Sequence, residues 1–305
     1  MTSSSEVISP GSLAAVTAEP GVAPPAASSP ARTASPDPGP GRPGWVQSAN
    51  GALKDNWVLL SLLCLAIFLA IWQFYTAATK ALPGPWEVAQ KSWFFLSDPF
   101  YDNGPNDQGI GILIGYSLMR LSLGFICGST VAIILGVVLG LNRTLYKALN
   151  PYIQVLRAIS PIAWMPLLLY SVQDSGWTAL LVVFMASVWP TLANTAFGVN
   201  NIKKEYLNVA AILQMPMLAK VFRVILPGAG PAIVAGLRIS MGSAWVAIVP
   251  AEALLGSLGL GYFVWNEWNN LDIGNVIFAI LVIGMVGVVL DLLFNRLAKV
   301  LAYTD

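Results

Sequence analysis

The residue types that carry most protein chemistry are sparse in this sequence. Its 305 residues include no histidine, which removes the commonest general base and metal ligand. The two cysteines, Cys64 and Cys127, both lie inside apolar runs, where small buried hydrophobes are expected rather than a disulfide or a metal site. No Gly-rich phosphate loop ending in Gly-Lys-Ser/Thr occurs, so no nucleotide site of that kind is expected on this chain. We therefore predict no catalytic residue, no metal site and no cofactor bound by this chain.

The composition predicts an all-α protein that crosses a membrane several times. Hydrophobic residues make up 56% and charged residues only 10%, whereas soluble domains carry about 25% charged residues. The formal net charge of +1 argues against a nucleic-acid binder. A membrane enzyme such as a lipid transferase would need clustered carboxylates or histidines at the bilayer surface, and the acidic residues here are dispersed.

Two regions differ in composition. The first 50 residues hold 9 of the 21 prolines, with many alanines, serines and glycines and no apolar block. Such a segment cannot bury enough apolar surface to offset its ordering entropy. We predict a disordered cytoplasmic tail over residues 1–52 and a transmembrane domain over 53–305.

About six transmembrane helices are expected in the second region. A span needs roughly 20 apolar residues, and 57–78 is uncharged and long enough. The segment 110–141 contains Arg120 and exceeds one straight crossing, so an amphipathic turn near Ser117–Arg120 is expected before the span itself. The other expected spans are 151–171, 177–197, 229–250 and 274–294.

Lysines and arginines predict the orientation. With the N-terminus in the cytoplasm, eleven basic residues lie inside and two, Lys80 and Lys91, lie outside. The C-terminus is then cytoplasmic too. Within the second span, small residues recur at every fourth position and are expected to let another helix approach closely, with a pore role as the alternative: Gly124, Gly128, Ala132, Gly136 and Gly140.

The longest predicted cytoplasmic loop, 198–228, is patterned like a helix. Leu207, Ala210, Ala211 and Gln214 fall at helical spacing, and the helix is expected to end before Pro216. A short amphipathic helix outside the membrane either docks into a groove on another protein or lies on lipid. The pattern alone leaves both interpretations open.

This loop resembles the coupling loop of ABC importer permeases, whose motif is glutamate-alanine-alanine, three residues, glycine, nine residues, isoleucine, one residue and leucine-proline. In that register Ala210 matches the second alanine, and Leu226-Pro227 matches the closing pair. The sequence departs from the motif at Asn208, Val209, Gln214 and Val224.

Further segments across residues 53–300 resemble the nitrate/sulfonate/bicarbonate branch of these permeases, and most of all its nitrate and bicarbonate members. They are LPGPWEV (82–88), DPFYDNGPNDQGIG (98–111), SLMRLSLGF (117–125), NPYIQVLRAISPIAWMPL (150–167), VWPTLAN (188–194), GLRISMGSAWVAIVPAE (236–252) and GLGYFVWNEWN (259–269).

The resemblance implies the type I ABC importer permease fold in a bacterial inner membrane. It also implies a second permease subunit, in a homodimer, two ATPase subunits that carry ATP and magnesium, and a periplasmic or lipid-anchored substrate-binding protein. Leu207, Ala210 and Ala211 would make apolar contacts with the ATPase, and Glu205 and Asn208 polar ones. The full set of coupling candidates is Glu205, Leu207, Asn208, Ala210, Ala211 and Gln214.

In this family the third to fifth helices surround the substrate path, and polar groups inside spans often mark such a path. The candidates are Trp164, Trp189, Asn194, Ser240, Ser243, Trp245 and Glu252. Arg157 and Arg238 could attract an anion, but we expect them to extend to the cytoplasmic interface.

The resemblance favours nitrate or nitrite as cargo, with bicarbonate, cyanate and an alkanesulfonate or taurine as alternatives. A passive anion channel is a rival that would need no coupling loop. The outer side carries eight acidic residues against two basic ones, a field that repels free anions. Selection is therefore expected mainly in a delivering protein, with a neutral polar path through the permease.

Overall fold

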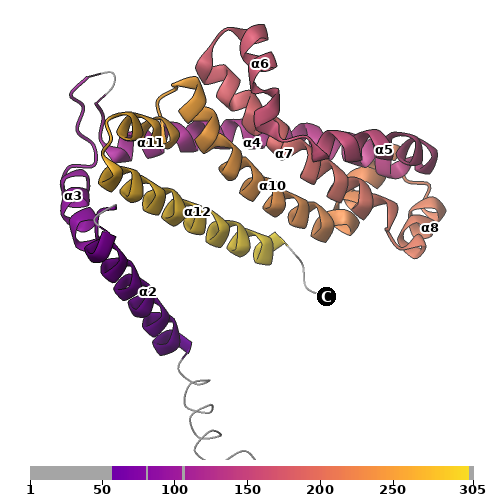
Figure 1. Cartoon of the computed structure of the whole chain (residues 1–305). Helices are drawn as coiled ribbons and strands as arrows, with labels where there is room; N and C mark the ends of the chain where they lie inside the picture. Colours follow the sequence, from indigo (N-terminus) through magenta and orange to yellow (C-terminus); the bar gives the residue numbers. More distant parts are fainter. Residues whose placement is uncertain (1–56, 80–81, 105–106, 302–305) are drawn as a thin grey trace, which may run out of the picture. The chain divides into compact units, whose positions relative to one another are not determined.

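Figure 1 shows the computed structural model, which describes residues 57–79, 82–104 and 107–301. The prediction of a disordered tail over 1–52 concerns residues outside these ranges. All regular structure in the described ranges is helical. In chain order the helices are α2 (Trp57–Thr79), α3 (Pro85–Ser97), α4 (Ile110–Leu141), α5 (Arg143–Ala158), the 3-10 helix η1 (Pro161–Trp164), α6 (Met165–Val172), α7 (Ser175–Asn200), α8 (Lys204–Ile212), α9 (Met217–Lys220), the π-helix η2 (Val221–Ile225), α10 (Leu226–Leu255), α11 (Leu260–Asn269) and α12 (Ile273–Leu301).

Five helices in the described residues are long and apolar enough to cross a membrane. They are α2, α4, α7, α10 with the turns before it, and α12. The residues from Leu62 onward form one compact unit, and the helices of the core pack within it. Five of the six expected spans are confirmed. Four of them agree to within a few residues at each end, whereas the expected span 229–250 is part of the longer helical stretch Met217–Leu255.

The third expected span, 151–171, is not one straight helix. α5 ends at Ala158, and the segment Pro161–Val172 continues at an angle of 87° to it. Ser160 is extended, with φ −58° and ψ 132°, and Pro161 begins η1. A proline disfavours the α conformation in the residue before it, which explains the break. This part of the chain is therefore a bent pair of helices, which has the geometry of a broken span or of a re-entrant loop.

The second expected span also differs, because α4 is one continuous helix of 32 residues with no separate first turn. Arg120 does not interrupt it, since its guanidinium makes an ion pair with the buried Glu252 of α10. A paired charge can lie within a helix bundle where an unpaired one is costly.

The small residues of α4 face α7. A Cβ atom on Gly128 would lie 2.8 Å from the carbonyl oxygen of Phe184, and one on Gly136 would lie 2.6 Å from Cβ of Thr195. Gly124 and Gly140 meet α7 in the same way. This ladder of small residues, from Gly124 to Gly140, therefore lets the backbones of α4 and α7 approach closely, which confirms the packing interpretation.

The main core lies where α4, α7, α10, α11 and α12 meet. Its fully buried side chains include Leu121, Val182, Ile248 and Leu260. In Figure 1, α10 runs between α7 and α12. In contrast, α2 exposes its leucine, isoleucine and phenylalanine side chains over almost its whole length. Such a surface suits contact with lipid.

Candidate functional site

Glu252 is completely buried and holds three helices together. Its carboxylate accepts hydrogen bonds from Ser117 Oγ at 2.7 Å, Arg120 Nη1 at 3.1 Å and the Gly261 amide at 3.2 Å. Ser117 Oγ in turn accepts from the Leu260 amide at 2.9 Å, and Arg120 also donates to the Leu258 carbonyl. Every oxygen of this carboxylate is used, so Glu252 connects α4, α10 and the start of α11.

Ser240 is likewise buried, between α7 and α10. Its Oγ lies 2.5 Å from Thr191 Oγ1 and donates to the Ser187 carbonyl at 2.8 Å. Asn194, one turn further along α7, donates to the Pro190 carbonyl of its own helix at 2.8 Å. The hydroxyl of Ser240 and the side-chain amide nitrogen of Asn194 are thus bonded within the protein.

The three tryptophans among the pathway candidates lie in different places. Trp189 packs against the small core between α4, α5 and α7, and Trp164 is half-buried at the end of η1. Trp245 is mostly buried, but its ring borders a hollow of about 630 Å³ between α10 and α12. The seven candidates therefore do not form one cluster.

A second hollow, of about 810 Å³, lies between α10, α12 and the break after α5. It is lined by Ser243, Arg238 and Asp291, together with Ser160 and Pro161. Arg238 and Asp291 form an ion pair in it, with Nη2 and Oδ1 3.2 Å apart. Ser243 alone among the polar pathway candidates lines this hollow.

Sequence reasoning missed Asp291, and it placed Arg238 at an interface rather than beside a partner. The signal was present, because Asp291 is an acidic residue within the apolar run of α12. The family resemblance points only to the third to fifth helices, and Asp291 lies on the last one, α12. The separation of 53 residues between the two partners also hides their proximity.

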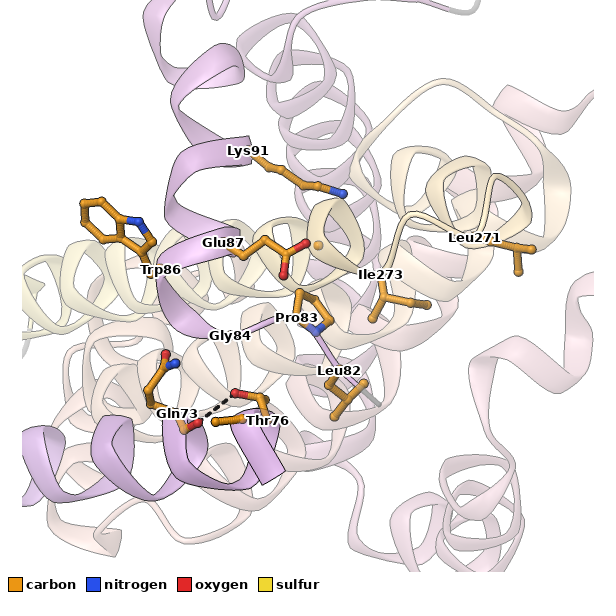
Figure 2. A pocket seen from close by; sticks show the side chains of 12 residues that line it. Gln73, Thr76, Leu82, Pro83, Gly84, Trp86, Glu87, Lys91, Leu271 and Ile273 are labelled. Atoms are coloured by element: carbon orange, nitrogen blue, oxygen red, sulfur yellow. Dashed lines mark hydrogen bonds between the residues drawn. The ribbon is translucent and has the colours of Figure 1, made fainter. Parts of the chain in front are cut away.

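A third cavity, of about 510 Å³, is bordered by the end of α2, the start of α3 and the loop before α12. Figure 2 shows Glu87 and Lys91 on one side of α3 and Trp86 on the other. Lys91 donates to both carboxylate oxygens of Asp272, at 2.8 and 3.0 Å. Burial raises the pKa of Asp272, but the hydrogen bonds from Lys91 and the Asn275 amide outweigh it, so this pKa lies below its ordinary value.

The insert between α3 and α4 contains one further group whose pKa is shifted. Partial burial and then a hydrogen bond with Asp107 raise the pKa of Tyr101 to about 12. Tyr101 therefore stays protonated at physiological pH. The hydroxyl helps to hold the insert, whose ends pair between Asp102 and Gln108.

The predicted coupling helix exists as α8, but its faces differ from the expected ones. Ala210 is buried and Leu207 is partly buried against a small core of α4, α7 and α10. Glu205, Asn208, Ala211 and Gln214 are exposed. The exposed large apolar side chains of this loop are instead Tyr206, Val209, Ile212, Leu213, Met217, Leu218 and Phe222.

Gln214 occupies the position at which the coupling motif has glycine, and it takes a glycine-like conformation. Its φ is 48°, in the left-handed region. The turn is closed by hydrogen bonds from the Gln214 amide to the Ala211 carbonyl at 3.0 Å and from the Met215 amide to the Ala210 carbonyl at 3.1 Å. Glycine adopts this conformation without the Cβ penalty that glutamine incurs.

Residues 128–303 match the family described as binding-protein-dependent transport system inner membrane component. The chain belongs to this family.

Two relatives give the resemblance more detail. The nitrate import permease protein NrtB of Synechococcus elongatus is 40% identical over 256 residues, which cover 82% of this chain and 90% of that protein. The bicarbonate transport system permease protein CmpB of the same organism is 38% identical over 251 residues, covering 81% and 88%. The predicted resemblance to nitrate and bicarbonate permeases is confirmed.

A solved structure confirms the fold. A chain of the inward-facing MetNI methionine ABC transporter superimposes with a TM-score of 0.56 at 14% sequence identity, covering 63% of this chain and 96% of that one. The chain therefore has the type I ABC importer permease fold that its sequence predicts.

Proposed function

We propose that this chain is the membrane-spanning permease subunit of an ATP-driven importer for nitrate or nitrite. The observation that carries the proposal is the 40% identity to a nitrate import permease over most of both chains. The bicarbonate permease relative, at 38%, supports bicarbonate as the second candidate cargo. Hydrolysis of ATP with magnesium would then occur on separate subunits.

In this proposal α8 docks into a groove of an ATPase subunit. The exposed apolar surface formed by Tyr206, Val209 and Ile212 supplies the contact, because Ile212 is 80% exposed and Val209 55%. Ala210, being buried, would set the spacing between α8 and the membrane helices. Glu205 and Asn208 would lie at the polar edge of the contact, and Ala211 would join its apolar part.

The assembly would contain a second permease copy, two ATPase subunits and a substrate-binding protein outside the membrane. The excess of lysine and arginine on the α8 side supports an orientation with that side and both termini in the cytoplasm of a bacterium. Exposed acidic side chains on the opposite side, such as Asp98, Asp102 and Asp107, would repel free anions. Capture by the binding protein would therefore precede entry into the permease.

The test is reconstitution of the chain in proteoliposomes, together with the ATPase and the binding protein that neighbouring genes encode. ATP hydrolysis is measured with nitrate, nitrite, bicarbonate, cyanate and taurine in turn. Nitrate or nitrite should stimulate hydrolysis most, and Ile212→Asp should abolish the stimulation whereas Ile212→Val should keep it. Stimulation by bicarbonate alone would reassign the cargo, and anion flux without any ATPase would establish a channel instead.

A further inference from the structure

Arg238 lies near the middle of α10, far from either end of the helix, and its partner Asp291 lies on α12. Nε and Nη2 of Arg238 are 3.3 and 3.2 Å from Asp291 Oδ1. Both side chains are about half exposed, at 50% and 54%. The pair is therefore held loosely at the edge of a hollow and not sealed in the core.

Such a pair does not suit a surface that faces hydrocarbon. Charged side chains within membrane spans face the interior of a bundle or a water-filled cavity. The hollows of about 810 and 630 Å³ meet at Gly242, Val246 and Asp291, and so form a continuous groove along α10 and α12. We infer that this groove holds water when the protein is in a membrane.

The guanidinium of Arg238 retains unused binding capacity. Asp291 engages Nε and Nη2, while Nη1 makes no hydrogen bond with any described residue. Arg120, the other arginine within the described apolar spans away from their ends, is committed to Glu252 and the Leu258 carbonyl. Arg238 is thus the basic group that this groove offers to a ligand.

We propose that Arg238 is a transient binding site for a small planar oxyanion, and that Asp291 is the competing acceptor which releases it. This inference rests on the proposed import of such an anion. A planar guanidinium matches two oxygens of a planar oxyanion through parallel hydrogen bonds. Ser160 lines the same hollow and can donate its hydroxyl to the oxyanion. Ser243 also lines it, but its hydroxyl donates to the Ile239 carbonyl at 3.0 Å and would have to turn away from that carbonyl to contribute.

The carboxylate gives the site the weak affinity that a transport path needs. A site along a path must bind well enough to admit an ion and weakly enough to let it leave. A bound anion and the Asp291 carboxylate compete for the same guanidinium donors of Arg238. When the carboxylate returns to these donors, the anion is released. The pair would thus exchange one acceptor for another without leaving an isolated positive charge.

The experiment measures the accessibility of Arg238 in the permease–ATPase complex in lipid nanodiscs, without binding protein. Phenylglyoxal labels arginines, and mass spectrometry quantifies the label on Arg238 and, as an internal control, on the exposed Arg143. Nitrate and bicarbonate are added in separate titrations. We expect one of them to protect Arg238 and neither to protect Arg143.

The Asp291→Asn variant should increase labelling of Arg238 and lower the half-protecting anion concentration about fivefold, the factor that corresponds to about 1 kcal/mol. A merely structural ion pair would show no protection by any anion in either protein, which would overturn the inference even if nitrate stimulates ATP hydrolysis. An Arg238 that is never labelled, with or without Asp291, would mean a sealed contact and would also overturn it. Protection by bicarbonate but not nitrate would support the site while refuting nitrate as the cargo.

Discussion

Replacement of Glu252 by glutamine tests whether this residue is part of the scaffold or of the substrate path. The carboxylate accepts three hydrogen bonds, from Ser117, Arg120 and the Gly261 amide. A glutamine side chain keeps one acceptor oxygen, but it replaces the other oxygen by an NH2 group. That NH2 group would face one of these hydrogen-bond donors, and two donors cannot bond to each other. It further leaves the Arg120 guanidinium without its counter-charge.

Removing one partner of a buried ion pair costs about 3 to 5 kcal/mol. For Glu252→Gln, the loss of unfolding free energy should lie near the lower end of this range, because one acceptor oxygen remains. That is a large part of a total stability of about 5 to 15 kcal/mol. The matched control is Glu87→Gln, an exposed carboxylate for which we expect a change within about 0.5 kcal/mol.

The assay is thermal unfolding of the purified permease–ATPase complex in detergent, followed by tryptophan fluorescence, to which each permease chain contributes 11 tryptophans. The double variant Arg120→Gln, Glu252→Gln should lose less stability than the two single losses added together, because the partners share one interaction. An unchanged midpoint with anion transport abolished would refute the scaffold role. It would restore Glu252 to the pathway, where the sequence placed it.

Two further predictions concern groups outside the membrane core. Replacing Gln214 by glycine should raise the unfolding midpoint of the complex and keep coupled ATP hydrolysis, because it removes about 1 kcal/mol of left-handed backbone strain; a lower midpoint would contradict this explanation. The Asp272–Lys91 pair should contribute up to about 1 kcal/mol at neutral pH. Because the pKa of Asp272 is lowered in the folded protein, this contribution is complete above the ordinary carboxyl pKa of about 4 and is lost as pH falls through the lowered value. Unfolding midpoints of Asp272→Asn and the unchanged protein should therefore differ at pH 7 and converge in acid, and a constant difference would argue against the pair.

The spans were predictable because membrane insertion depends on local composition. A run of apolar residues long enough to cross the bilayer is visible without knowledge of its neighbours. The ladder from Gly124 to Gly140 was predictable for the same reason, since its spacing repeats within one helix. The break at Pro161 carried a local signal as well, but its angle of 87° depends on what packs around it.

The candidate site was less predictable, because polar residues within spans look alike in a sequence. Glu252 and Asp291 are both acidic residues in apolar runs. One is sealed by Ser117 and Arg120, whereas the other meets Arg238 beside an open groove. Nothing within a few residues of either distinguishes these environments.

The amino-acid sequence alone therefore established a multi-pass helical permease, its family and the position of the short helix α8. These properties follow from apolar length, charge asymmetry and short motifs, all of which are local along the chain. The roles of Ala210, Glu252 and Arg238 came from the folded arrangement, in which they are respectively buried, bonded and left beside a hollow. Such roles depend on contacts between helices that are far apart in sequence. The free energy of such a contact depends on both helices and on how they pack, so no single segment determines it.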